Sequence, residues 1–123
     1  MRTVNTTVDF IARGSTPEEW KMVLVETGPW LKPIDLHLRD LQERLYGCLD
    51  AALDGKLAEQ FPESLGKSVV IQLDCYNVPK NNVRAFFNSF ADGVLLIEDY
   101  RQALVGNRFV KGISFEVTFD SIH

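Results

Sequence analysis

A strict alternation of apolar and polar side chains near the carboxyl end is the feature that most constrains the fold. Over residues 113–119 the order is Ile113, Ser114, Phe115, Glu116, Val117, Thr118, Phe119. Because successive side chains of a strand point to opposite faces, this segment predicts a strand with one buried and one solvent-facing side. Such a strand requires neighbouring strands and a second layer that covers its apolar side.

Three further segments predict strands. Residues 68–76 alternate in the same way, and residues 20–26 are rich in β-formers and follow a polar turn. In residues 3–12, Val8, Phe10 and Ala12 share the side of the strand that is predicted to be buried. The first two strands are joined by a short polar loop, which favours an antiparallel hairpin.

Two regions have the 3.6-residue period of helices. In residues 33–54 the apolar side chains form one continuous stripe, made of Ile34, Leu38, Leu41, Leu45, Cys48 and Ala52. The second region begins near Lys80 and contains Gly93, which predicts a break between two helical pieces. An alternative interpretation makes residues 93–100 a strand. We favour helix there because charged residues and alanine follow.

The predicted order is therefore β-β-α-β-α-β in a single domain, residues 1–123. Its fold class is α+β, a two-layer α/β sandwich with a four-stranded mixed sheet and helices on one face. Three of the predicted strands have a polar side, as expected of a sheet whose second face has no helical cover.

Composition limits the classes of function. Hydrophobic residues make up 46% of the chain, which argues against intrinsic disorder, and no apolar run has the length of a membrane span or a secretory signal. A formal charge of −4 disfavours nucleic acid and anionic lipid as partners. Cys48 and Cys75 lack metal-ligand or redox spacing and are predicted to be buried thiols. We expect a cytoplasmic protein that does not contact membranes.

The chain resembles a small bacterial domain family of unknown function over roughly residues 8–90. The resemblance rests on the segment Val8-Asp9-Phe10-Ile11, the pair Trp30-Leu31, the helical pattern around Leu41-Gln42-Glu43, the segment Gly55-Lys56-Leu57, the pair Phe61-Pro62 and the strand of residues 69–73. It implies a bacterial origin and an α+β fold. It implies no catalytic residues, because the family has no established activity.

The polar side of the predicted sheet holds the main candidate site. It is expected to present carboxylates and an amide together, namely Asp9, Gln72, Asp74, Glu116 and Asp120. Such a cluster can hold a basic protein surface, bind a cation or supply acid–base groups, and it can equally be an ordinary solvated face. Trp30, in a predicted loop, either closes the core or anchors a partner. Metal-binding and nucleophile motifs are missing from the sequence, so we predict no cofactor, no metal site and no catalytic residues.

Two classes of function remain. The sequence favours a non-enzymatic protein-interaction module that acts as a homodimer, because the chain is acidic and rich in apolar residues; binding of a basic partner would resemble the action of bacterial immunity proteins. One of the neighbouring residues Phe86 and Phe87 is expected to point out of the core, toward a second subunit. The alternative is a small enzyme or ligand-binding domain. Its pocket would lie between sheet and helices, lined by Trp20, Tyr76 and Tyr100, with Asp74 or Glu116 as the acid–base group.

Overall fold

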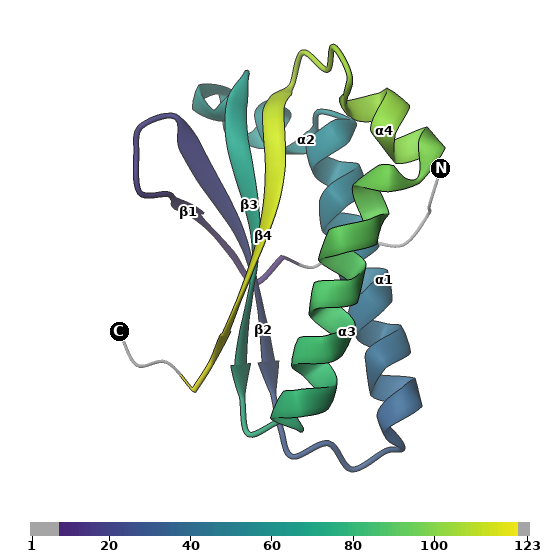
Figure 1. The fold of residues 1–123 in the computed structure, drawn as a ribbon. Helices are drawn as coiled ribbons and strands as arrows, with labels where there is room; N and C mark the ends of the chain where they lie inside the picture. Colours follow the sequence, from purple (N-terminus) through teal and green to yellow (C-terminus); the bar gives the residue numbers. More distant parts are fainter. Residues whose placement is uncertain (1–7, 121–123) are drawn as a thin grey trace.

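The structure, a computed structural model, describes residues 8–120 and consists of one sheet with helices packed on one side (Figure 1). In chain order the elements are β1 (Phe10–Arg13), β2 (Glu19–Thr27), α1 (Ile34–Leu53), α2 (Lys56–Gln60), β3 (Lys67–Tyr76), α3 (Lys80–Gly93), α4 (Glu98–Leu104) and β4 (Val110–Phe119). Single 3₁₀ turns occupy Pro62–Ser64 and Val94–Leu96. Within the described range no helix has both the length and the apolar content that crossing a membrane requires.

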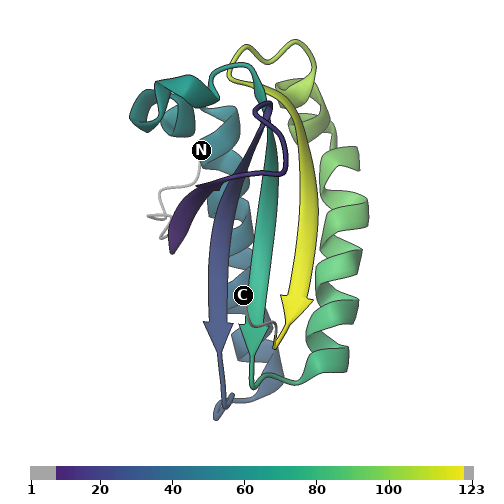
Figure 2. The same cartoon turned by 90° about the vertical axis from the view of Figure 1, so that its left-hand side faces the viewer.

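The sheet has the strand order β1-β2-β3-β4. β1 pairs with β2 in antiparallel fashion, whereas β2, β3 and β4 are parallel. Both parallel connections therefore cross over through helices, and such crossovers nearly always have the same hand. Because the chain moves across the sheet in the same direction twice, α1 and α3 lie on the same face (Figure 1). Figure 2 views the opposite face, which no helix covers. The predicted mixed sheet with helices on one face is confirmed.

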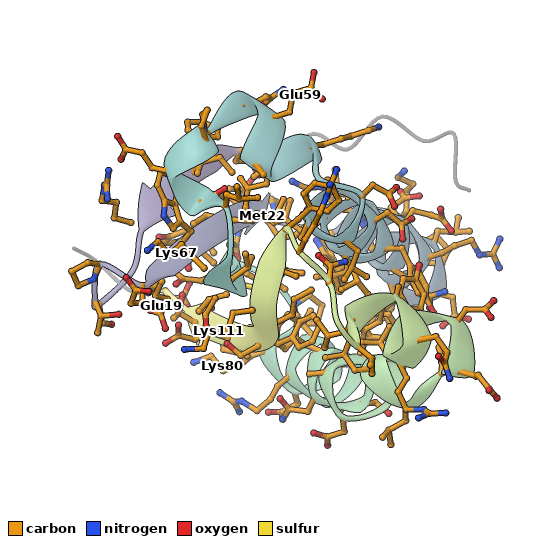
Figure 3. All side chains as sticks on the ribbon, turned by 90° about the horizontal axis from the view of Figure 1, so that it is seen from above. Glu19, Met22, Glu59, Lys67, Lys80 and Lys111 are labelled. Atoms are coloured by element: carbon orange, nitrogen blue, oxygen red, sulfur yellow. The ribbon has the colours of Figure 1, made fainter. Side chains whose placement is uncertain are left out.

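The core lies between the sheet and the two long helices. β3 contributes Val69, Ile71, Leu73 and Cys75, whose exposure is at most 1%. The predicted stripe of α1 packs against them, and its members Leu41, Leu45, Cys48 and Ala52 are completely buried. Figure 3, seen along the strands, shows Met22 of β2 in the interior and Glu59 pointing outward from α2. Truncating one such leucine to alanine costs about 2–5 kcal/mol, so this stripe alone makes a large contribution to stability.

The first strand differs from its prediction. β1 spans only four residues, and residues 3–7 of the predicted strand lie outside the described part. Ile11 packs against the core, whereas Phe10 is 50% exposed. The reason is the register: Phe10 pairs with Val23, whose side chain points to the uncovered face. The expectation that Phe10 and Ala12 form the buried side is therefore wrong.

The region after α3 follows the preferred prediction. α3 ends at Gly93, the 3₁₀ turn follows, and α4 begins at Glu98, so the alternative of a strand over residues 93–100 is wrong. The last strand begins earlier than predicted, at Val110. A register shift opposite Lys67 and Ser68 leaves Lys111 without a direct partner on β3 and restores the alternation from Gly112 onward.

Candidate functional site

The uncovered face of the sheet carries a row of polar side chains on its three parallel strands. We call it the open face. It consists of the side chains that point away from the helices: Lys21, Val23 and Val25 from β2, Val70, Gln72 and Asp74 from β3, and Ser114, Glu116 and Thr118 from β4. Parallel pairing places Val23, Gln72 and Glu116 side by side, and Val25, Asp74 and Thr118 form the next row.

Hydrogen bonds connect this row across the strands. The Lys21 ammonium donates to Gln72 Oε1 at 2.9 Å, and the Gln72 amide donates to Asp74 Oδ1 at 2.8 Å. The Thr118 hydroxyl donates to the same oxygen at 2.8 Å. Lys21 Nζ also lies 3.6 Å from a carboxylate oxygen of Glu116. The network holds these side chains in one arrangement.

Burial divides these groups into two kinds. Asp74 is 6% exposed and Gln72 is 9% exposed, so both act mainly as internal members of the network. The Glu116 side chain is 53% exposed and that of Lys21 is 24% exposed. The members of this network region that solvent can reach are therefore Glu116, Lys21 and their exposed neighbour Ser114. The buried Asp74 carboxylate accepts hydrogen bonds from Gln72 and Thr118 and so keeps both side chains in place. Buried polar groups usually have such partners.

Three of the predicted site residues, Gln72, Asp74 and Glu116, are thus brought together. Asp120 lies just after β4, where its carboxylate accepts from the Asn77 backbone N–H at 3.2 Å. Asp9 does not join them, and its predicted place on the open face is wrong. Its carboxylate accepts from the Val25 N–H at 2.6 Å and from Arg44 of α1 at 2.7 Å. Because Phe10 faces the uncovered side, the alternation places Asp9 on the helix side, where Arg44 donates to it.

Asp9 instead belongs to an ionic cluster along the edge of β2. Arg44 donates to Asp9 and, at 2.9 Å, to Glu26, and its other contact is the Val25 carbonyl oxygen at 3.4 Å. Both backbone groups of Val25 are therefore satisfied by side chains at the point where β1 no longer pairs with β2. This edge of the sheet is closed to further strands.

Trp30 lies away from the open face, in the loop before α1. Its ring stacks on His37 with centroids 4.6 Å apart and planes 6° from parallel. The Lys32 backbone N–H donates to His37 Nε2 at 3.2 Å, which fixes the imidazole under the indole. Trp30 is half-buried and packs against the core, as expected if it closes that end of the molecule. Whether it also anchors a partner stays a prediction.

The pocket expected for an enzyme is not formed by the predicted residues. Trp20 points to the helix side, where its ring lies 5.7 Å from that of Phe61. Tyr100 of α4 stacks on Tyr46 and donates to Asp50 at 2.7 Å. Tyr76 has the strand parity of Gln72 and Asp74 and so lies on the other side of the sheet. These three aromatic residues cannot line a single cavity.

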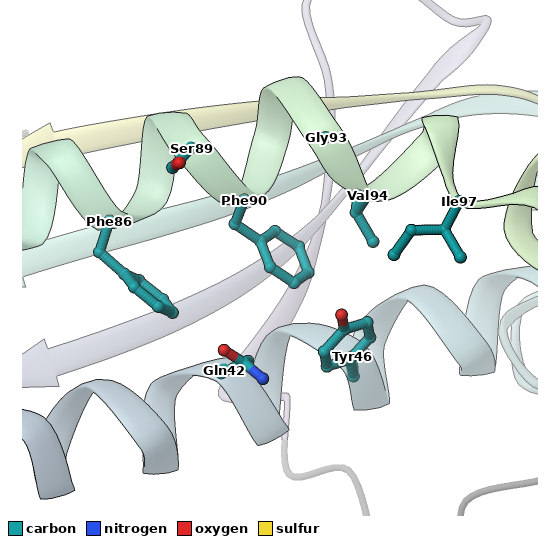
Figure 4. Close-up of a pocket in the computed structure, with 8 residues that line it drawn as sticks. All are labelled: Gln42, Tyr46, Phe86, Ser89, Phe90, Gly93, Val94 and Ile97. Atoms are coloured by element: carbon teal, nitrogen blue, oxygen red, sulfur yellow. The ribbon is translucent and has the colours of Figure 1, made fainter.

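A groove that the sequence did not reveal runs between α1 and α3 (Figure 4). Its volume is about 390 Å³, and its lining residues are Gln42, Tyr46, Phe86, Ser89, Phe90, Gly93, Val94 and Ile97. Phe86 projects into it, whereas Phe87 is buried in the core. That Phe86 faces a second subunit stays a prediction. The signal was present in the helical spacing of Phe86 and Phe90, but the opposing residues of α1 could not be known without the helix packing.

The thiols of Cys48 and Cys75 are buried and remain protonated at neutral pH. Burial raises the pKa of Cys48 and of Cys75 to about 12, so neither is a thiolate near neutral pH. Across residues 8–120 no group of three histidine, cysteine or acidic side chains is placed to hold a metal ion.

Comparison of the chain with protein-family models, with curated proteins and with solved structures found no match.

Proposed function

We propose that this chain is a non-enzymatic protein-interaction module that acts as a homodimer and binds a partner protein with its open face. The observation that carries the proposal is the hydrogen-bonded row that joins Lys21, Gln72, Asp74 and Thr118 on a face without helical cover. A pre-arranged polar surface on a rigid sheet suits recognition of another protein. The proposal includes a bacterial origin and a cytoplasmic location.

The partner that suits this face has a basic surface. Glu116 is the most exposed charged group of the row, Asp120 adds a second carboxylate at the end of β4, and the whole chain carries a net charge of −4. Lysine and arginine side chains would complement these carboxylates and speed the encounter. The analogy is to immunity proteins that neutralise a basic toxin.

The test of the partner site compares two charge reversals. Glu116→Lys changes the open face, whereas Glu59→Lys changes an exposed position on α2, far from it (Figure 3). Against the purified partner, calorimetry should show at least tenfold weaker binding for Glu116→Lys and less than a twofold change for Glu59→Lys. Equal effects of the two variants would contradict the proposal.

The dimer is expected to form through the groove between α1 and α3. Ile97, which lines one end of the groove, is 45% exposed, and its chain neighbour Leu96 is 75% exposed. Phe86 lines the other end and is half-buried (Figure 4). A second copy related by a twofold axis would cover the same residues on both chains.

Light scattering after size exclusion tests this contact. The wild-type chain should have twice the 13.9 kDa mass of one chain, and Leu96→Glu should reduce it to one. Val105→Glu is the matched control, since Val105 is also exposed, by 70%, but lies after α4, whereas Leu96 is the chain neighbour of the lining residue Ile97. A wild-type monomer at high protein concentration, or a dimer that Leu96→Glu leaves intact, would contradict this arrangement.

A further inference from the structure

The outer edge of β4 differs from the other edge of the sheet. β4 pairs only with β3, and among residues 8–120 no strand lies on its other side. The amide of Asp120 donates to the Cys75 carbonyl at 2.7 Å, which fixes the direction of the backbone groups along the strand. With the two-residue period of a strand, the even residues face β3 and the odd residues face outward. The outward amides and carbonyls are those of Ile113, Phe115, Val117 and Phe119.

The same four residues are incompletely covered on the helix side. Their side chains are half-buried, although their direct neighbours on β3 are completely or almost completely buried. Phe115 touches the edges of Phe87 and Phe90, with ring centroids 6.3 and 5.8 Å apart. From Gly112 to its end the strand has no proline and no bulge, the usual devices that block an edge. The edge at Val25, in contrast, is closed by Asp9 and Arg44.

The position of α3 decides what kind of partner fits. Figure 2 shows α3 beyond β4, on the side away from β3. A second copy paired edge to edge through a twofold axis normal to the sheet would place its own α3 on the same face, next to this one. A single extended segment has no such helix, and its inward side chains would lie beneath α3. On α3, Ala91 lies one helical turn after Phe87, whose ring contacts Phe115 of β4, and Ala91 is half-buried.

The charged side chains near this edge are three cations, together with the Asp120 carboxylate at the end of β4 and Glu116 on the open face. The Arg84 guanidinium lies 4.8 Å and the Lys80 ammonium 5.8 Å from the centre of the Phe119 ring. Lys111 is exposed at the other end of β4. An added strand with acidic residues toward its ends would meet a cation at each end.

We propose that the β4 edge binds an extended, acidic peptide segment of a partner protein as a fifth strand of the sheet. The four outward residues supply main-chain hydrogen bonds, α3 covers alternate apolar side chains of the peptide, and Lys80, Arg84 and Lys111 select negative charge. This site is separate from the open face and from the groove, so it does not depend on the dimer.

The test uses a synthetic seven-residue peptide with a glutamate at each end and alternating valine and threonine between them, titrated into the full chain and followed by amide NMR. The outward amides of Ile113, Phe115, Val117 and Phe119 should shift and become protected from hydrogen exchange. The same peptide with N-methylated alternate residues keeps its side chains but cannot pair, and it should bind at least tenfold more weakly. A peptide with lysine in place of glutamate should bind more weakly by a similar factor.

Variants of the chain provide the second arm. Val117→Pro removes an outward amide that β3 does not use, so the sheet should survive while the affinity falls about tenfold. Val117→Ala removes side-chain atoms but keeps the amide, and its affinity should stay within about threefold of wild type. Arg84→Glu should weaken binding about fivefold, whereas Lys56→Glu on α2 should not. Undetectable binding of the alternating peptide at millimolar concentration, unchanged outward amides, or equal binding of the N-methylated peptide would overturn the proposal.

Discussion

Asp74 shows how a single residue organises the open face. One of its carboxylate oxygens receives hydrogen bonds from Gln72 and Thr118, and so joins β3 to β4 through side chains as well as through the backbone. With both Asp74 and Gln72 largely inaccessible, water cannot readily replace a lost partner. The carboxylate therefore contributes to stability and to the shape of the binding surface.

Asp74→Ala tests this role. The Gln72 amide and the Thr118 hydroxyl would both lose their acceptor, so the free energy of unfolding should fall by about 2 kcal/mol. Thr118→Val removes only one of the two donors and should cost about 1 kcal/mol. Urea denaturation measures both values. A smaller loss for Asp74→Ala than for Thr118→Val would show that the network does not hold the face together.

The buried thiols give a second test at the scale of residues. Burial raises the pKa of Cys48 and Cys75 from 9.0 to about 12 in the folded chain, so the folded state retains these protons longer than the unfolded state does. Their contribution to stability is complete below pH 9 and is lost as the pH rises from about 9 to 12. At pH 8 a disulfide reagent should label both thiols slowly in the native protein and rapidly in urea. Rapid labelling of the native chain would contradict the burial of both residues.

At the scale of elements, most of the fold was predictable because each element buries one side only. The alternation in β3 and β4 and the stripe of α1 are direct consequences of such burial, and the sequence located all three to within a few residues. β1 was misjudged because it is a short edge strand whose two sides are both partly exposed, so its pattern carries little information. The groove depends on how α1 and α3 pack, which no single segment encodes.

The candidate site was likewise predictable only where local strand parity determines the position of a side chain. Gln72, Asp74 and Glu116 were correctly grouped because strand parity and a parallel register place them together. Asp9 was misplaced because the two sides of β1 were assigned the wrong way round, and its position is set by an ion pair with Arg44, 35 residues further along the chain. The β4 edge could not be found from the sequence, since strand order decides which strand lies outermost.

Arg44 ties α1 to the edge of β2, and Arg44→Gln tests that connection. Its partners are partly exposed, with side-chain exposures of 35% for Asp9 and 16% for Glu26, so solvent screening limits the expected loss to about 1 kcal/mol. The loss should shrink in high salt, and the Val25 amide should exchange faster with solvent. Arg39→Gln, on an exposed position of α1, is the control. Identical stability and exchange in the two variants would contradict a role of Arg44 in closing this edge.

For the whole molecule, two crossovers in the same direction leave three surfaces of different chemistry: a polar open face, an apolar groove between helices, and a free strand edge. The first two follow from placing both long helices on one side of the sheet. The third exists because β4, the strand after the last crossover, is the outermost strand of the sheet. There α3 extends past β4 (Figure 2). The three surfaces therefore lie on different parts of residues 8–120.

If the dimer forms through the groove, dimerisation must raise the thermal unfolding temperature of the chain. Only the folded chain presents Phe86, Leu96 and Ile97 together, so mass action predicts that the Tm rises with protein concentration. Scanning calorimetry over a hundredfold range of concentration should show a rise of several degrees for wild type. Leu96→Glu should abolish this dependence, while Val105→Glu, another exposed apolar position, should keep it. A Tm independent of concentration in the wild-type chain would show that the groove remains exposed and that the module acts as a monomer.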